Sequence, residues 1–171
     1  MKGNTMSVGD AKKVKQVKRR TWMMPQEVEV WYVLPAIRRE LAKVMKTKVV
    51  QRADAEGKMK DHKITQKEIA RMLGVTEPAI TQYLLKKKDK RSRGDQVAMP
   101  NQILHEIDKS SETMIKDFEN ARMSNQKDIF EIMTKEINRI INIMRDAGFM
   151  CDIHREFCAH ANDPCEACDT K

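Results

Sequence analysis

Apolar residues recur at helical spacing through the second half of the chain. Residues 97–123 and residues 125–147 each carry a stripe of apolar side chains close to a heptad repeat, which predicts two amphipathic helices. The two stripes are formed by Ile103, Ile107, Met114, Phe118 and Ala121, and by Ile129, Ile132, Met133, Ile137, Ile140, Ile141 and Met144. We expect a helical hairpin that packs on itself, on the rest of the chain or on a second copy. Of these alternatives, packing on a second copy is favoured over a purely intramolecular core.

The first half begins with a similar pattern. Residues 22–48 repeat apolar positions at helical spacing, and Pro35 must kink or split that helix near Val33. The best strand candidate, residues 28–33, is interpreted as the start of the helix. Residues 49–64 are mostly polar, which predicts a loop or a frayed helical extension. The sequence therefore predicts an all-α fold.

Two short helices joined at a glycine are predicted within residues 65–88. Thr65 and Glu68 have the spacing of a capping box, and Gly74 is suited to end the first helix in a left-handed conformation. Thr76 is a suitable N-cap for the second helix, and Pro78 is tolerated in its first turn. The second helix would present a polar outer face.

The stretch TQKEIARMLGVTEPAITQYLLKKK resembles the helix-turn-helix of the Cro and phage-repressor family, the xenobiotic-response-element class. Ala70 stands at the family's small packing position, Gly74 at its turn, and Ile80 and Tyr83 at core positions. The resemblance implies that the second helix lies in the major groove of double-stranded DNA. The resemblance places Gln66 at the position that commonly touches the DNA backbone. From the start and the polar outer face of the second helix we also expect DNA contacts from Thr76, Glu77, Pro78, Thr81 and Gln82, with Thr81 and Gln82 reaching base edges. The alternative is an ordinary αα-hairpin.

Charge is distributed unevenly over the 171 residues. Residues 1–94 hold 24 Lys or Arg against 10 Asp or Glu, whereas residues 95–171 hold 9 against 15, within a net charge of +8. A basic half that contains a helix-turn-helix favours a polyphosphate ligand. The basic run after the second helix is expected to clamp phosphates through Lys86, Lys87, Arg91 and Arg93, unless it is only solvated. Residues 1–21 are expected to be a disordered basic arm or a solvated leader.

All four cysteines lie in the last 21 residues, as Cys151, Cys158, Cys165 and Cys168 in the spacing C-x6-C-x6-C-x2-C. The segment is predicted to be a short loop around a metal, because it is too short to form its own core. A disulfide is disfavoured inside a cell. The alternatives are a structural zinc ion and an iron–sulfur cluster. The zinc ion would be bound by four thiolates, or by three thiolates and one imidazole from His154 or His160. Such histidines are more often simply solvated.

The opening MPQEVEVWYVLPAIRRELAKVM resembles an archaeal group of regulators. Members with this helix-turn-helix and a cysteine-rich tail are similar to iron–sulfur-binding transcription factors, which implies a 4Fe-4S cluster on the four thiols. We therefore expect a basic arm (1–21), a DNA-binding domain (22–94), a dimerisation region (95–150) and a cluster-binding tail (151–171). A homodimer is expected because a two-fold axis sets half-site spacing.

The expected function is a cytoplasmic, sequence-specific transcription regulator whose operator affinity is modulated by the cluster. The alternative is a regulator or architectural DNA-binding protein with a structural zinc. The sequence has no phosphate loop or catalytic carboxylate pair, so an enzyme is not expected. It also has no apolar run of membrane-spanning length and no signal peptide, and so we expect no membrane partner.

Overall fold

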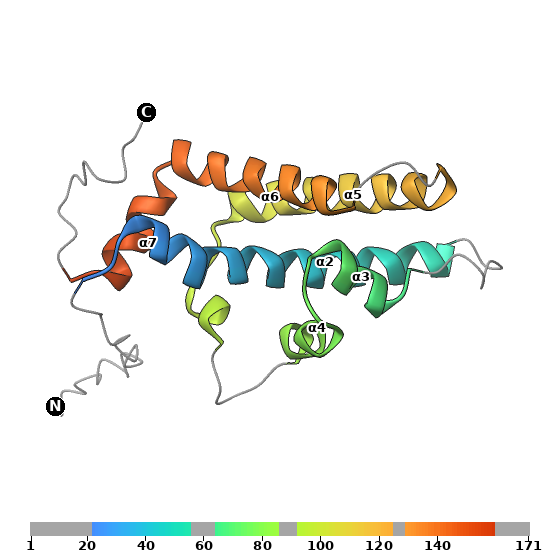
Figure 1. Cartoon of the computed structure of the whole chain (residues 1–171), viewed down its shortest axis with the longest axis horizontal. Helices are drawn as coiled ribbons and strands as arrows, with labels where there is room; N and C mark the ends of the chain where they lie inside the picture. Colours follow the sequence, from blue (N-terminus) through green and yellow to red (C-terminus); the bar gives the residue numbers. More distant parts are fainter. Residues whose placement is uncertain (1–21, 56–63, 86–91, 125–128, 160–171) are drawn as a thin grey trace, which may run out of the picture.

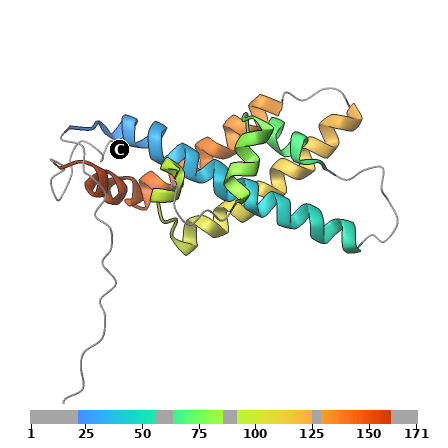
Figure 2. The ribbon, with the colours of Figure 1, turned by 90° about the horizontal axis from the view of Figure 1, so that it is seen from below.

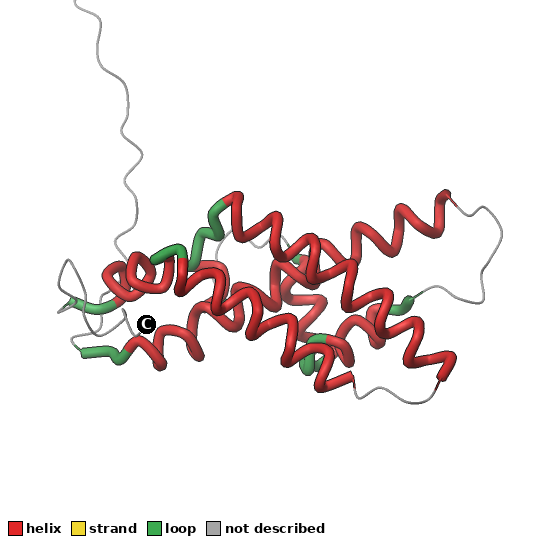
Figure 3. The backbone as a smooth tube through the Cα atoms, turned by 90° about the horizontal axis from the view of Figure 1, so that it is seen from above, coloured by secondary structure: helices red, strands yellow, loops and turns green. Residues whose placement is uncertain are grey.

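The computed structural model describes residues 22–55, 64–85, 92–124 and 129–159. Within these ranges the regular structure is helical, with no β-strand (Figure 3), which confirms the all-α prediction. The elements are α1 (Pro25–Val28), η1 (Glu29–Val33), α2 (Leu34–Ala55), α3 (Gln66–Met72), α4 (Glu77–Leu84), η3 (Arg93–Gln96), α5 (Asn101–Ser124), α6 (Ile129–Asp146) and α7 (Phe149–Phe157).

Helix α2 is the axis on which the other helices pack. Its 22 residues lie between α5 and α6 on one side and α4 and η3 on the other (Figures 1 and 2). Ile37, Leu41 and Met45 are completely buried and lie on successive turns of α2, on the face that lines the common core. Helix α5 of the acidic half and the predicted reading helix α4 are thereby placed on opposite sides of α2.

The irregularity predicted around Pro35 takes the form of a π-helical turn. Residues Glu29–Val33 form η1, in which the Leu34 amide donates to the Glu29 carbonyl five residues earlier. Proline has no amide proton, and its ring clashes with the carbonyl four residues before it, here that of Trp31. The wider turn accommodates that clash while the helix continues into α2.

The two apolar stripes of α5 and α6 are buried within the chain. Ile103, Ile107, Ile140 and Met144 are no more than 1% exposed, and the two helices pack along their length (Figure 1). The stripes therefore form intramolecular core. The homodimer remains a prediction, but the apolar surface assigned to it is already covered within the chain. The sequence could not distinguish these two cases, because periodicity identifies a buried face without identifying what covers it.

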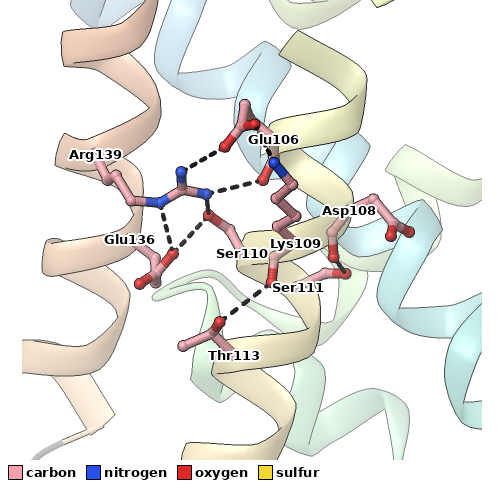
Figure 4. A network of polar contacts seen from close by, with 8 residues as sticks. All are labelled: Glu106, Asp108, Lys109, Ser110, Ser111, Thr113, Glu136 and Arg139. Carbon is pink, nitrogen blue, oxygen red and sulfur yellow. Dashed lines mark hydrogen bonds and ion pairs between the residues drawn. The ribbon is translucent and has the colours of Figure 1, made fainter. Parts of the chain in front are cut away.

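A polar network crosses the interface between α5 and α6 (Figure 4). Arg139 donates to Glu106 Oε2 at 2.6 Å and to Ser110 Oγ at 2.7 Å, and Ser110 donates to Glu136 Oε2 at 2.6 Å. Ser110 is fully buried, so its hydroxyl needs these partners. The Arg139 and Lys109 hydrogen bonds lower the pKa of Glu106 to about 2.

The loop predicted from Cys151 is wrong over its first part, where the chain forms α7. Gly148 has φ +77° and precedes this helix, so it separates α6 from α7 as expected for a helix-ending glycine. Met150, Ile153, Phe157 and Cys158 are buried, because they recur at helical spacing and pack against α1 and α6. The cysteine-bearing segment thus contributes to the core.

In the described residues, no helix combines the length and the apolar character needed to cross a membrane.

Candidate nucleic-acid interface

The predicted pair of short helices is present as α3 and α4. The Glu68 amide donates to Thr65 Oγ1 at 3.2 Å, and the Thr65 amide donates to Glu68 Oε2 at 2.7 Å, so the predicted capping box is formed. Gly74 has φ +61°, the left-handed conformation predicted for the turn. An added Cβ there would lie 2.9 Å from Met133 Sδ of α6, so the turn also packs directly on the hairpin.

The inner sides of α3 and α4 are buried against the core. Ile69, Leu73 and Ile80 are fully buried, and Ala70 is 3% exposed, as its small packing position requires. Tyr83 is half-buried and packs against the same core. The two helices are therefore fixed to the scaffold by one face each.

The residues of this helix that are predicted to contact DNA are exposed, at the N-cap and on the outer face of α4. They are Thr76, Glu77, Pro78, Thr81 and Gln82, of which Thr81 and Gln82 are predicted to reach base edges. Thr76 has the extended conformation of an N-cap, although its hydroxyl makes no capping hydrogen bond. Four of the five fall in one and a half turns of helix, which is a surface of the size that inserts into a major groove.

One hydrogen bond connects the two helices on this exposed surface. Gln66 Nε2 donates to Thr81 Oγ1 at 2.7 Å, and the Thr81 hydroxyl donates to the Glu77 carbonyl at 3.3 Å. The predicted backbone-contacting residue thus orients a predicted base-contacting residue. The Thr81 hydroxyl thus donates one hydrogen bond and accepts one, so its oxygen has one further lone pair that can accept from a donor.

The far end of the basic run is anchored on α2 by η3. Ser92 donates through its amide and hydroxyl to Asp95 Oδ2 at 2.8 and 2.9 Å, while Arg39 donates to Asp95 Oδ1 at 2.5 Å. Partial burial raises the pKa of Asp95, but the hydrogen bonds from Ser92 and Arg39 outweigh it and lower the pKa below its usual value. Gly94 is buried against α2, where a Cβ would lie 2.8 Å from the Pro35 carbonyl carbon.

Arg93 is exposed, and its guanidinium carbon lies 5.2 Å from the centre of the Trp31 ring. This is a cation–π distance, and it limits the conformations that the long side chain samples. The other residues predicted to clamp phosphates, Lys86, Lys87 and Arg91, lie outside the described residues. The chain leaves α4 and re-enters at η3 on the same side of α2 (Figure 1), so both ends of the basic run face the side of the reading helix.

The cysteines do not form a ligand set in the described part of the structure. Cys151 is half-buried and Cys158 is buried, while Cys165 and Cys168 lie outside the described residues. Two positions seven residues apart on a helix are separated by about 10 Å along its axis, whereas a tetrahedral zinc ion with bonds of about 2.3 Å holds two sulfurs about 3.8 Å apart. Cys151 and Cys158 therefore do not converge on one zinc ion while α7 is helical. Across the described residues, no three His, Cys, Asp or Glu side chains are close enough to bind a metal ion.

His154 is a second correction to the predicted tail. Its side chain was expected to be solvated, but it is 5% exposed, and Nε2 lies 2.7 Å from the Met23 carbonyl oxygen. The histidine thus connects α7 to the residues that precede α1. His160 lies outside the described residues.

The sequence prediction lacked the cap of η3 and two long-range contacts that support this surface. Ser92-x-x-Asp95 has the spacing of a capping box, so that signal for η3 was available. No local signal pairs Arg39 with Asp95 or Trp31 with Arg93, because each pair is separated by more than fifty residues and meets only through the fold.

A comparison of the chain with models of known families, with curated proteins and with solved structures finds no match.

Proposed function

We propose that this protein binds double-stranded DNA in a sequence-specific manner and regulates transcription, with α4 as the reading helix. The observation that carries the proposal is the exposed start of α4, where Thr81 is oriented by Gln66 while the opposite face of the helix is buried. Such an arrangement supplies polar groups of fixed direction to base edges in a major groove.

The charge distribution supports the same proposal. The basic half of the chain, residues 1–94, contains α3 and α4, and the acidic half contains α5, α6 and α7. Because α4 and α5 lie on opposite sides of α2 (Figure 2), DNA approaching α4 would meet the side of α2 that carries α4 before it met the acidic helix α5. Phosphate contacts would position the duplex, and α4 would supply the specificity.

The test is selection of duplexes from a fragmented genomic or random library with the full-length protein, followed by affinity measurement at several salt concentrations. We expect enrichment of a defined site and a specificity ratio of at least about 10³ over random duplex. The variant T81A/Q82A should lose discrimination, since each base contact contributes about 1–3 kcal/mol. Its affinity for random duplex should be unchanged, because phosphate contacts are retained.

The matched control is Q102A/T113A, which removes the same two residue types from exposed positions on α5, on the other side of α2. This variant should bind the selected site as the wild type does. Uniform, salt-sensitive binding without an enriched site would instead favour the architectural alternative. Unchanged recognition by T81A/Q82A would refute the assignment of α4.

Modulation by an iron–sulfur cluster on Cys151, Cys158, Cys165 and Cys168 remains a prediction. Anaerobic purification followed by visible absorption and by iron, sulfide and zinc analysis tests it directly. Iron and sulfide in equal amounts would support a cluster. One zinc ion without sulfide would support the structural-metal alternative, in which DNA binding is retained without a redox response.

A further inference from the structure

Helix α7, which carries Cys151, and the short helix η3 contact the same π-helical turn, η1. The Tyr32 ring of η1 stacks on Phe157 of α7, with ring centres 4.0 Å apart and an angle of 21° between the planes. The preceding residue, Trp31, lies beneath the guanidinium of Arg93. Neighbouring residues of one short turn thus face α7 and η3 respectively.

Further contacts hold η1 on both sides. Arg145, at the end of α6, bonds Glu29 at 2.5 Å, and His154 bonds the Met23 carbonyl ahead of α1. On the other side, the backbone of Gly94 packs against the Pro35 carbonyl with no space for a Cβ. Because Pro35 lies in α2 only two residues after η1 ends, a displacement of η1 that moves the start of α2 would reach η3 through this backbone contact as well as through the Trp31 ring.

The joint between these contacts is an irregular element. Single π-helical turns are uncommon and occur often at functional positions. Phe157 is followed directly by Cys158, which caps the end of α7 and is buried. Any event that moves the backbone at Cys158 would thus change the stacking of Phe157 on Tyr32.

We propose that α7 positions Arg93 for its contact with DNA phosphate through η1, with Phe157 and Tyr32 as positioning residues. The proposal rests on the proposed DNA-binding function, and it assigns to α7 the means of changing DNA affinity. Phe157 itself contacts no DNA. Its effect on binding should therefore disappear when Arg93 is replaced.

The first test measures the coupling without DNA. The chain has two tryptophans, so W22F leaves Trp31 as the sole fluorophore. In this background F157L should increase acrylamide quenching of Trp31, whereas I153A, which removes buried apolar volume from α7 but retains the Tyr32–Phe157 ring pair, should not. Y32L breaks the same ring pair from η1 and should reproduce the F157L result. Unchanged quenching in both F157L and Y32L would overturn the proposal.

The second test is a double-mutant cycle on affinity for a random-sequence duplex at fixed salt. F157L should weaken binding between about 2- and 30-fold when Arg93 is present. In the R93Q background it should change affinity by less than about twofold. An equal loss in both backgrounds would mean that Phe157 acts only through stability and would overturn the positioning role. If the wild-type protein binds no duplex, the proposed function fails, while the quenching experiment still decides whether α7 and Trp31 are coupled.

Discussion

Replacement of Gly94 by alanine should destabilise the protein. Gly94 is buried in η3, and a Cβ at this position would lie 2.8 Å from the Pro35 carbonyl carbon, 2.9 Å from its oxygen and 2.9 Å from the Ala36 nitrogen. Ordinary van der Waals contacts of a Cβ begin at 3.4 Å, so η3 and α2 would have to separate by about half an ångström. These neighbours are backbone atoms of a central helix, and no side-chain rotation relieves the contact.

Two opposing effects determine the size of the change. Alanine restricts the unfolded chain and by itself would stabilise the protein by about 0.4–1 kcal/mol. Overpacking of a tightly packed site costs about 1–3 kcal/mol. The midpoints of these two ranges differ by about 1.3 kcal/mol, a net loss that for a chain of this length lowers Tm by roughly 3–5 °C.

The assay is urea unfolding followed by circular dichroism, together with affinity for a random duplex. G94A should lower the denaturation midpoint and also weaken DNA binding, because it displaces the anchor beside Arg93. The control is G148A, which has open space around the added Cβ but φ +77°. That variant should lose about 1–2 kcal/mol from backbone strain alone and retain DNA affinity. A G94A protein as stable as the wild type, or more stable, would refute the close-contact reasoning.

Three other substitutions test contacts at the site and in the hairpin. T65A should cost about 1 kcal/mol by removing the α3 cap, whereas T65S should retain most of it in the same urea experiment. Because the pKa of Glu106 is lowered, its interactions with Arg139 and Lys109 contribute fully to the free energy of unfolding above about pH 4.5 and are lost as the pH falls toward about 2. The difference in Tm between the wild type and E106Q should therefore shrink over that pH range and stay constant from pH 5 to 7. D95N should destabilise the protein by roughly 1 kcal/mol, because it weakens the hydrogen bonds from Arg39 and Ser92 that anchor η3. R39K keeps the charge but loses the fixed geometry, so it should show part of that loss. Equal urea midpoints for D95N and the wild type would contradict the anchoring role of Asp95.

Local signals were sufficient to predict helices α3 and α4 and the turn between them from sequence. The Thr65 capping box, the left-handed Gly74 and the proline in the first turn of α4 each depend on residues within four positions of one another. Their geometry is therefore set by short-range sterics and hydrogen bonding. The same is true of the disturbance before Pro35, whose position was predicted but whose π-helical form was not.

Contacts between distant segments could not be predicted in this way. The stripes of α5 and α6 indicated buried faces correctly, but a stripe carries no information about whether a second copy or the same chain covers it. The anchor of η3 depends on Gly94 meeting Pro35 and on Asp95 meeting Arg39, pairs that are brought together only by packing of η3 on α2.

The misprediction at α7 has a physical cause that also bears on the metal question. The clustered cysteines predicted a loop around a metal, but Met150, Ile153 and Phe157 have the spacing of a buried helical face. Forming that face removes Cys158 from solvent and places Cys151 two turns away from it. A single zinc ion bound by all four thiols is therefore expected to unwind the end of α7 and to disturb the Phe157–Tyr32 pair, whereas a centre that spares Cys158 is expected to leave the helix intact. Cofactor loading followed by circular dichroism and by Trp31 quenching in the W22F background separates these cases, because only the first predicts a loss of helix together with greater access to Trp31.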